Sequence, residues 1–231
     1  MCSLENWEER WQQKDTPWVG DRVNDSFYSA YPRLLQLLQL PPDQISAFVP
    51  LAGNSPAVRF LYDKGHAVTA VEYVAEALNS LRTEQFSGID LKIQDLQSPA
   101  AKKIGKAYSA GRLSLREQDI FDFPANKQFD LIYDRGALVA FPPEDQPRYA
   151  RRISDSLSPR GVIFVRCSEF ADASAYNGPP FSVGTERIKL LFPDLVIVEE
   201  SSETIQTTQP RHLDAGIKSI ALIDLTLVRG S

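Results

Sequence analysis

The sequence has few of the residues that bind metals or form disulfides. It contains two cysteines and two histidines among 231 residues. Neither His66 nor His212 has a cysteine or histidine partner at the spacing of a zinc site, so we expect no metal. Cys2 and Cys167 lie far apart without an obvious neighbouring base, and both are predicted to be free thiols. We expect His66, which follows a glycine in a helix-to-strand turn, to be structural, whereas His212 either positions its neighbour or lies in solvent.

The sequence also lacks a basic excess and long apolar runs. Its formal net charge is −5, which leaves no electrostatic footprint for broad binding to nucleic-acid phosphates. Its apolar stretches are far shorter than the roughly 20 residues that cross a bilayer. Residues 1–7 have neither the basic start nor the apolar core of a secretory signal. We therefore expect a cytoplasmic protein, a monomer, that binds neither nucleic acid nor a membrane.

What is present is an alternation of strand-like and helix-like patterns, as in α/β proteins. One helix is expected at residues 4–13 and another at 31–40, where Pro41 ends it. The region 87–111 is polar and weakly patterned, and we expect a helix-containing insertion there. Strands are predicted at residues 47–51, 67–72, 113–118, 129–134, 161–167, 195–200 and 219–228, with helices at 57–64, 74–85, 144–157 and 184–191.

This order of elements predicts one domain with a mostly parallel sheet covered on both faces. The last two strands are joined by a loop without an obvious helix, which indicates a terminal antiparallel pair. We therefore expect a Rossmann-like three-layer α/β/α fold. Its seven-stranded sheet is mostly parallel and has a C-terminal antiparallel strand pair.

Ligands of such sheets bind at the carboxyl ends of the strands, and two features fall there. Gly53, in the turn after the first buried strand, lets a ligand approach the backbone closely. The turn is not a G-x-G-x-x-G motif, and a plain strand-to-helix connection fits it equally well. Glu72 ends the next strand, where a carboxylate can accept hydrogen bonds from both ribose hydroxyls of an adenosine. The alternative for Glu72 is a solvated acid at a strand end.

Two later segments place polar groups at the same edge. Residues 119–122 follow the third of the central strands, where an acid can meet an adenine amino group and an apolar side chain can cover the ring. Arg135 follows the fourth and would pair with a carboxylate or an anionic substrate. A surface salt bridge of Arg135 with Asp134 or Glu144 is the alternative.

The tryptophans are concentrated near the N-terminus. Trp7 and Trp11 are four residues apart and share one face of the expected helix. Together with Trp18 they belong either to a lid over the ligand site or to the core, where aromatic residues at helical spacing usually lie.

Taken in order, these motifs resemble the thiopurine S-methyltransferase family from Trp7 to about Leu227. The resemblance implies an S-adenosylmethionine-dependent methyltransferase of one domain, residues 1–231, with residues 1–30 as an N-terminal lid. It also implies a role in detoxification, with a small-molecule methyl acceptor. The matching segments are W-x3-W-x4-T-x-W at 7–18, V-P-L-A-G-N-S at 49–55, G-H-x-V-x3-E at 65–72, T-E-Q at 83–85, D-I-F-D at 119–122, D-R-G-A-L-V-A at 134–140, G-P-P-F at 178–181 and R-H at 211–212.

The same resemblance implies which residues form the site. Those expected around S-adenosylmethionine are Trp7, Trp11, Leu51, Gly53, Glu72, Asp119, Ile120 and Arg135. The acceptor is expected to face Trp18, Arg135 and Arg211. The two arginines are the implied catalytic residues, because a guanidinium can orient an acceptor and stabilise its anionic form.

Several positions depart from the family pattern. Ala52 and Asn54 replace a cysteine and a lysine of the first turn, Asp119 stands where a serine is frequent, and Ala215 replaces a tryptophan. Residues 16–18 look closer to plant thiol and halide methyltransferases. The acceptor therefore stays open among thiopurines, small thiols, halides, and selenium or tellurium species.

Two other functions fit part of the pattern. An NAD-binding Rossmann oxidoreductase would share the acidic strand end at Glu72, although the sequence lacks the glycine triplet and a clear hydride-transfer residue. A catalytically decayed cofactor-binding module would fit the departures at Ala52, Asn54 and Ala215.

Overall fold

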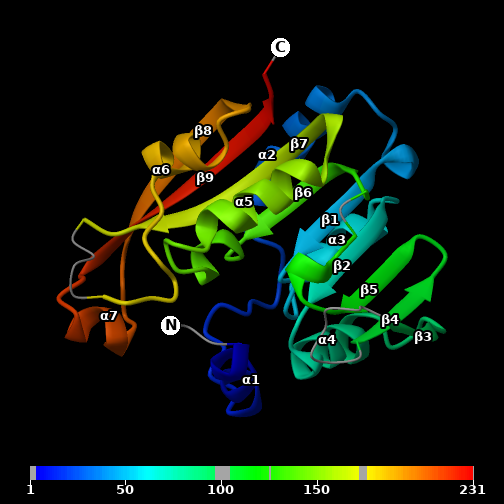
Figure 1. Cartoon of the computed structure of the whole chain (residues 1–231), viewed down its shortest axis with the longest axis horizontal. Coiled ribbons are helices and arrows are strands. Elements are labelled where there is room, and N and C mark those ends of the chain that lie inside the picture. The colour runs from blue at the N-terminus through cyan, green and yellow to red at the C-terminus, as the bar shows by residue number, and fades with distance from the viewer. Residues whose placement is uncertain (1–3, 97–104, 125, 172–175, 231) are drawn as a thin grey trace.

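The computed structural model describes residues 4–96, 105–124, 126–171 and 176–230, without the side chains of residues 4–6. Figure 1 shows a single twisted sheet that runs through the whole molecule. Its strand order is β3-β4-β5-β2-β1-β6-β7-β9-β8. The strands are β1 (Ser46–Pro50), β2 (Ala67–Glu72), β3 (Lys92–Leu96), β4 (Gly105–Ala110), β5 (Leu113–Glu117), β6 (Phe129–Arg135), β7 (Leu157–Glu169), β8 (Leu195–Gln206) and β9 (Ser219–Arg229).

The centre of the sheet is parallel and its C-terminal edge is antiparallel, as the sequence predicts. Strands β5, β2, β1, β6 and β7 are parallel neighbours. Strand β9 inserts between β7 and β8 and is antiparallel to both. The carboxyl ends of five parallel strands therefore meet along one edge of the sheet.

The sheet has nine strands rather than the seven expected. The described residues of 87–111 contain no helix, and the expectation of a helix-containing insertion is wrong for them. They form β3 and β4, which extend the sheet as an antiparallel pair beside β5. Strand β3 is exposed along most of its length. An exposed edge strand needs no apolar run, which explains why β3 could not be predicted from its polar sequence.

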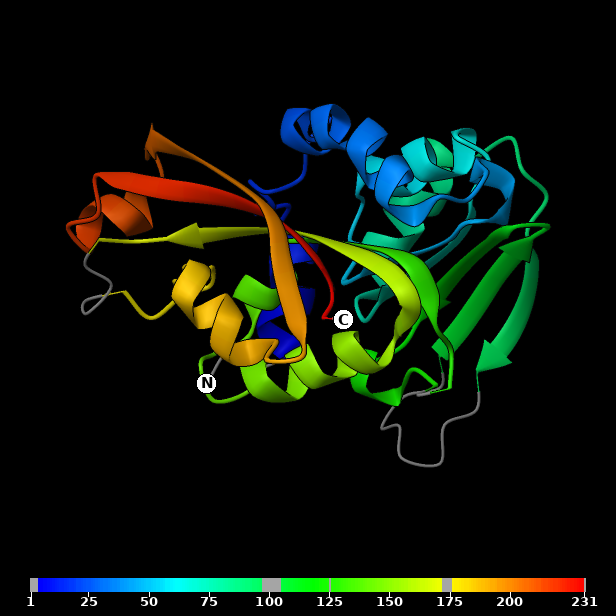
Figure 2. The same ribbon diagram turned by 90° about the horizontal axis from the view of Figure 1, so that it is seen from above.

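The helices cover both faces of the sheet. In Figure 2, α2, α3 and α4 lie on one side of the sheet and α5 and α6 on the other. No helix within the described ranges is both long and apolar enough to cross a membrane. The helices are α1 (Leu4–Gln12), α2 (Asp25–Leu38), α3 (Pro56–Asp63), α4 (Ala75–Ser80, continued by a π turn Leu81–Gln85), α5 (Gln146–Asp155), α6 (Thr185–Leu191) and α7 (Pro210–Asp214).

Helices α2 and α7 differ most from the expected pattern. Helix α2 begins six residues before Tyr31, because the Asn24 side chain accepts hydrogen bonds from the backbone N–H groups of Ser26 and Phe27. The connection between β8 and β9, expected without a helix, contains the five-residue α7. Its first residue is Pro210, which fits the first turn of a helix because its missing N–H has no intrahelical partner there.

Alternating residues of the central strands supply a core to each face. Tyr133 of β6 packs with Phe27 of α2 on one face, whereas Ile132 packs with Tyr149 and Ile153 of α5 on the other. This alternation follows from the two-residue period of a strand. The three-layer α/β/α arrangement is confirmed.

Candidate active site

The turn after β1 brings the backbone into contact with the N-terminal helix. Leu51 and Gly53 both have positive φ angles, 45° and 52°. A Cβ atom at Gly53 would lie 3.2 Å from the Trp11 ring. Glycine therefore suits this position for two reasons, the left-handed backbone and the close approach of an indole. The turn therefore connects β1 to α3 and also contacts the Trp11 ring, which a plain strand-to-helix connection would not do.

Glu72, at the carboxyl end of β2, is tied to the same turn. It is 6% exposed. Its Oε2 accepts a hydrogen bond from the Gly53 N–H at 2.8 Å, and its Oε1 accepts one from the Val74 N–H at 2.7 Å. Burial raises the pKa of Glu72, and the backbone donors oppose this shift. The alternative of a solvated acid is wrong, because the carboxylate is buried and held in one orientation.

The segment after β5 lies beside Glu72. The backbone N–H of Gln118 donates to the Glu72 carbonyl at 2.9 Å. Asp119 follows and accepts a hydrogen bond from the Phe121 N–H at 2.9 Å, which caps the short 3-10 turn Ile120–Asp122. Ile120 is 4% exposed. The structure thus brings these two predicted residues next to the Glu72 end of β2.

The three tryptophans gather into one cluster. The Trp18 ring lies 5.4 Å from Trp7 and 6.5 Å from Trp11, in edge-to-face geometry. The Arg10 guanidinium lies 4.2 Å from the centre of the Trp18 ring, and its Nε donates to Asp15 at 2.9 Å. All three indoles are partly exposed and belong to neither of the two large cores. This placement fits the lid alternative better than the core alternative.

Arg135, at the carboxyl end of β6, joins the tryptophan cluster to the sheet. Its Nη1 donates to the Trp18 carbonyl at 2.8 Å, and its side chain is exposed. Asp134, proposed above as a salt-bridge partner, points away from it and is fully buried. There it accepts hydrogen bonds from the Tyr149 hydroxyl at 2.7 Å and the Leu138 N–H at 3.1 Å. Burial raises the pKa of Asp134 to about 6.

A small hollow opens beside Arg135. It lies between the segment that links α1 to α2, the start of α3 and the end of β6. Arg22, Asn24, Ser55 and Tyr133 contribute to its lining together with Arg135. Arg22, one of the two arginines at this opening, is paired with Asp25 at 3.1 Å. Arg135 bonds to the neutral carbonyl of Trp18, and its positive charge favours a small anionic occupant.

Arg211 lies on α7, near Tyr176. Burial raises the pKa of Tyr176, while the positive charges of Arg211 and Arg10 lower it, so both guanidinium groups act on one phenol. The Tyr176 hydroxyl contacts His212 Nε2 at 3.1 Å, and His212 Nδ1 contacts the Thr207 hydroxyl at 2.8 Å. His212 is 4% exposed, so the solvent alternative for it is wrong.

The remaining cysteine and histidine have no place in this site. Cys167 is a free, buried thiol whose pKa is raised to about 12 by burial, so it is no nucleophile near neutral pH. The free-thiol prediction is confirmed for Cys167, while Cys2 lies outside the described residues. His66 is buried between the Tyr31 hydroxyl and the Pro42 carbonyl, 2.7 Å from each, which confirms its structural role. The described residues contain no acid, cysteine or histidine cluster that could hold a metal.

One departure from the family pattern has a structural explanation. Asn54 Nδ2 donates to Glu84 at 2.7 Å, and Gln85 Nε2 donates to Asn54 Oδ1 at 2.7 Å. The asparagine therefore ties the first turn to the end of the α4 segment with both ends of its amide. A lysine is not needed for that connection.

The sequence did not reveal four residues that the structure places at this edge. Arg10 and Tyr176 lie beside predicted residues, and Arg166 and Asp224 form a buried ion pair at 2.8 Å between β7 and β9. A signal for the last two is present in the sequence. Arg166 is the one charged residue of the predicted strand 161–167 and Asp224 is the one charged residue of the predicted strand 219–228. A charge inside such a largely apolar stretch needs a buried partner.

Comparisons with known proteins agree with the motifs. The family model described as thiopurine S-methyltransferase matches residues 2–224. The thiopurine S-methyltransferase of Bordetella petrii is 31% identical over 97% of this chain and 98% of its own. Two solved structures share the fold. A methyltransferase from Anabaena variabilis has a TM-score of 0.63 at 15% identity, covering 98% of this chain and 94% of its own. The N-methyltransferase NodS from Bradyrhizobium japonicum, in complex with S-adenosylhomocysteine, has a TM-score of 0.62 at 16% identity, covering 98% of both chains.

These findings confirm the expected fold class, enzyme class and cofactor, and they do not favour an NAD-dependent oxidoreductase or a decayed module. The family match spans the tryptophan cluster, both arginines proposed for the acceptor and the sheet as far as Asp224 in β9. The chain belongs to the thiopurine S-methyltransferase family and is an S-adenosylmethionine-dependent methyltransferase.

Proposed function

We propose that this enzyme methylates a small, soft and anionic acceptor, such as a thiolate, a deprotonated thiopurine, or a selenium or tellurium oxyanion. The observation that carries the proposal is the position of Arg135. It lies at the carboxyl end of a central strand, exposed, bordering a hollow and bonded to the backbone of Trp18. A fixed guanidinium at such a place binds an anion in a defined orientation.

The residues around the first turn fit the cofactor. Glu72 Oε1 and Oε2 each accept one backbone N–H, and a carboxylate oxygen can accept a second hydrogen bond. The two oxygens can thus hold two ribose hydroxyls. Asp119 lies at the adjacent strand end, where we assign it to the adenine amino group, and Ile120 to the ring. We assign Trp7, Trp11, Leu51 and Gly53 to the remaining wall of the cofactor site.

S-adenosylmethionine supplies an electrophilic methyl group on a sulfonium. The protein has to align the acceptor with that group and exclude water, and it needs no covalent nucleophile of its own. Arg135 and Arg211 orient the acceptor and stabilise its negative charge. Trp18 forms the apolar side of the acceptor site. Soft nucleophiles are favoured because they are already reactive as anions and require no general base.

The proposal is tested by measuring methyl transfer from labelled S-adenosylmethionine to a matched panel. The panel holds a thiopurine, a small aliphatic thiol, iodide, selenite and tellurite, with an alcohol and an amine of similar size as controls. We expect turnover with at least one soft acceptor, with a rate that falls in the Arg135→Ala variant. Turnover confined to the amine or alcohol, or equal rates in wild type and variant, would contradict the proposal.

A further inference from the structure

A buried ion pair lies in the same row of side chains as Arg135. Arg135 of β6 is the register partner of Arg166 of β7, and Arg166 is the register partner of Asp224 of β9. Paired residues on neighbouring strands direct their side chains to the same face. That face is the one covered by α2, because Tyr133 and Phe164, two positions earlier, pack in the α2 core. The pair is therefore aligned with a residue of the proposed acceptor site.

This pair is costly to bury. Arg166 Nη1 lies 2.8 Å from Asp224 Oδ2, and each side chain is only 9% exposed. Burial raises the pKa of Asp224, and the charge of Arg166 opposes that shift. The cost of removing two charges from water often equals or exceeds their attraction, and an apolar pair of similar size is commonly as stable. Stability alone is a weak reason for a charged pair at this point.

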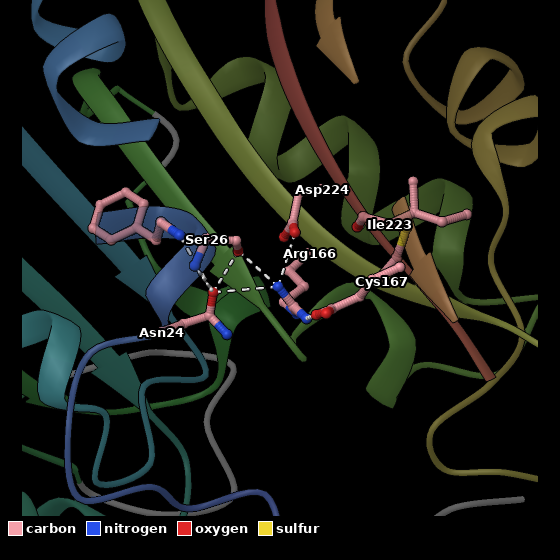
Figure 3. Close-up of polar contacts among 8 residues, drawn as sticks. Asn24, Ser26, Arg166, Cys167, Ile223 and Asp224 are labelled. Atoms are coloured by element: carbon pink, nitrogen blue, oxygen red, sulfur yellow. Dashed lines mark hydrogen bonds and ion pairs between the residues drawn. The ribbon is translucent and has the colours of Figure 1, made fainter. Parts of the chain in front are cut away.

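The pair holds the first residues of α2. Figure 3 shows the Arg166 guanidinium between Asp224 and the start of the helix. Its Nη1 also donates to the Ser26 hydroxyl at 2.6 Å and to Asn24 Oδ1 at 3.3 Å. Asn24 Oδ1 is the oxygen that caps α2. Arg166 thus fixes the point at which the segment from α1 joins the packed helix.

The other end of that segment is held by the neighbouring arginine. Arg135 Nη1 binds the carbonyl of Trp18, and Trp18 packs against Trp7 and Trp11 of α1. Residues 18–24 therefore lie between two anchors that come from adjacent positions of β6 and β7. Trp11 in turn lies on Gly53, beside Glu72. The position of α1 over the cofactor residues depends on this short linker.

We infer that Arg166 and Asp224 are positioning residues that fix the linker 18–24, and through it the closed position of the tryptophan-bearing helix over the cofactor site. The effect on ligand affinity rests on the proposed function of that site. Asp224 orients Arg166 and shares its positive charge with Glu203, an exposed acid of β8 whose Oε1 lies 2.6 Å from Arg166 Nη2. Arg166 in turn binds Asn24 and Ser26. Neither residue of the pair touches a reacting group.

The chain carries a built-in reporter for this inference. It has three tryptophans, Trp7, Trp11 and Trp18, and all of them lie in the cluster held by the linker. Acrylamide quenching of tryptophan fluorescence therefore reports on α1 and the linker without interference from the sheet. This readout needs no substrate, so its outcome does not depend on the proposed activity.

The test is the double variant Arg166→Met with Asp224→Leu, which replaces the pair by apolar side chains of similar length. We expect the melting temperature to stay near that of the wild type or to rise. We expect the acrylamide quenching constant to increase about twofold, and the Kd for S-adenosylhomocysteine to rise about fivefold to tenfold, because apparent affinity falls with the closed fraction. Calorimetry measures that Kd without an acceptor, which separates this inference from the identity of the acceptor.

A matched control is the pair Arg33 and Glu199, which joins α2 to β8 at 2.8 Å without contacting the linker. Replacing Arg33 by Met and Glu199 by Leu should leave quenching and Kd unchanged. If the two double variants shift both readouts equally, the effect is a general loosening of α2 and the inference is overturned. Wild-type quenching in the Arg166–Asp224 variant would also overturn it. Increased quenching with a wild-type Kd would support the anchoring of the linker and would contradict the proposed position of the cofactor site instead.

If the double variant does not fold, two variants of Asn24 test the same inference. Asn24→Asp keeps an acceptor oxygen for Arg166 and for the helix cap, whereas Asn24→Ala removes it. We expect Asn24→Asp to retain wild-type quenching and Kd and Asn24→Ala to increase both. Identical values in Asn24→Ala and wild type would overturn the inference.

Discussion

Two buried acids near the ligand edge of the sheet are held in different ways. Glu72 is held by backbone N–H groups from Gly53 and Val74, both close to it in the fold of the first turn. Asp224 is held by a guanidinium from the neighbouring strand, 58 positions away in sequence. The first arrangement follows from backbone geometry, whereas the second requires two particular side chains. On the cofactor side, backbone N–H groups thus hold the buried acid, whereas on the acceptor side another side chain holds it.

The cofactor side and the acceptor side respond differently to departures from the family pattern. Asn54 replaces a lysine on the cofactor side, but its amide still ties the turn to Glu84 and Gln85. On the acceptor side, Ala215 replaces a tryptophan close to Arg211, which changes the volume beside an implied acceptor residue. Substitutions on the acceptor side are the ones that we expect to change the acceptor.

Of the substitutions considered, Glu72→Ala should have the largest effect, which is a loss of affinity for the cofactor. Glu72→Ala removes two acceptor oxygens and leaves the Gly53 and Val74 N–H groups unpaired. We expect affinity for S-adenosylmethionine to fall at least about 100-fold, since two hydrogen bonds to a charged group contribute about 1.5–3 kcal/mol each. Calorimetry measures the loss. Asp130→Ala is the control, because Asp130 also accepts a backbone N–H, from Ser46 at 2.9 Å, but at the opposite end of its strand. Wild-type affinity in Glu72→Ala would remove Glu72 from the site.

Arg135→Ala tests the acceptor side and should have the next largest effect. Loss of the guanidinium should lower kcat/KM for the acceptor about 30-fold, which corresponds to about 2 kcal/mol of electrostatic stabilisation. The melting temperature should change little, because the side chain is exposed. Arg59→Ala is the matched control, since Arg59 is an exposed arginine of α3 paired with Asp63. Unchanged turnover in a folded Arg135→Ala protein would refute the role.

Asp134 gives a stability effect of intermediate size that depends on pH. Burial raises its pKa in the folded protein to about 6, above the ordinary value of 3.8 for an aspartic acid. Between these values the folded state binds more protons than the unfolded state, so the free energy of unfolding falls as pH rises from about 4 to about 6. We expect Asp134→Asn to reduce that fall by about 2 kcal/mol. Urea unfolding across this pH range measures it, and identical slopes for variant and wild type would contradict the assignment.

The smallest effect is expected at Cys167. Cys167→Ala removes a buried sulfur that makes no contact with the site, so kcat should stay within about twofold of the wild type, and stability should fall by about 1 kcal/mol. In a Cys2→Ser background, the folded protein should not react with a thiol reagent at pH 8, because burial raises the pKa of Cys167 to about 12. Rapid modification of the folded protein would show that this thiol is accessible.

The sequence predicts the parts of the molecule that depend on local patterns. The seven strands of the parallel core and its antiparallel edge follow from apolar runs, and the turn at Gly53 follows from its position after one of them. Strand β3 was missed because an exposed edge strand carries no apolar signal. The start of α2 was missed because its cap, Asn24, lies in a polar stretch resembling a loop.

The candidate site could be predicted only in part for a similar reason. Glu72 ends one predicted strand and Arg135 directly follows another, so sequence position alone places them at the ligand edge. The pairing of Arg166 with Asp224 depends on the register of two strands that are far apart in the chain. Arg10 and Tyr176 likewise reach the site through contacts between distant segments, which no local pattern specifies.

We expect the cofactor to bind between the first turn and the tryptophan cluster, with Glu72 as its ribose ligand. A crystal structure with S-adenosylhomocysteine bound tests this claim most directly. The account predicts both ribose hydroxyls on the Glu72 carboxylate, Trp7 and Trp11 packed over the ligand, and an open space beside Arg135 for the acceptor. A ligand bound away from Glu72, or one that leaves the tryptophans without contact to it, would contradict the account.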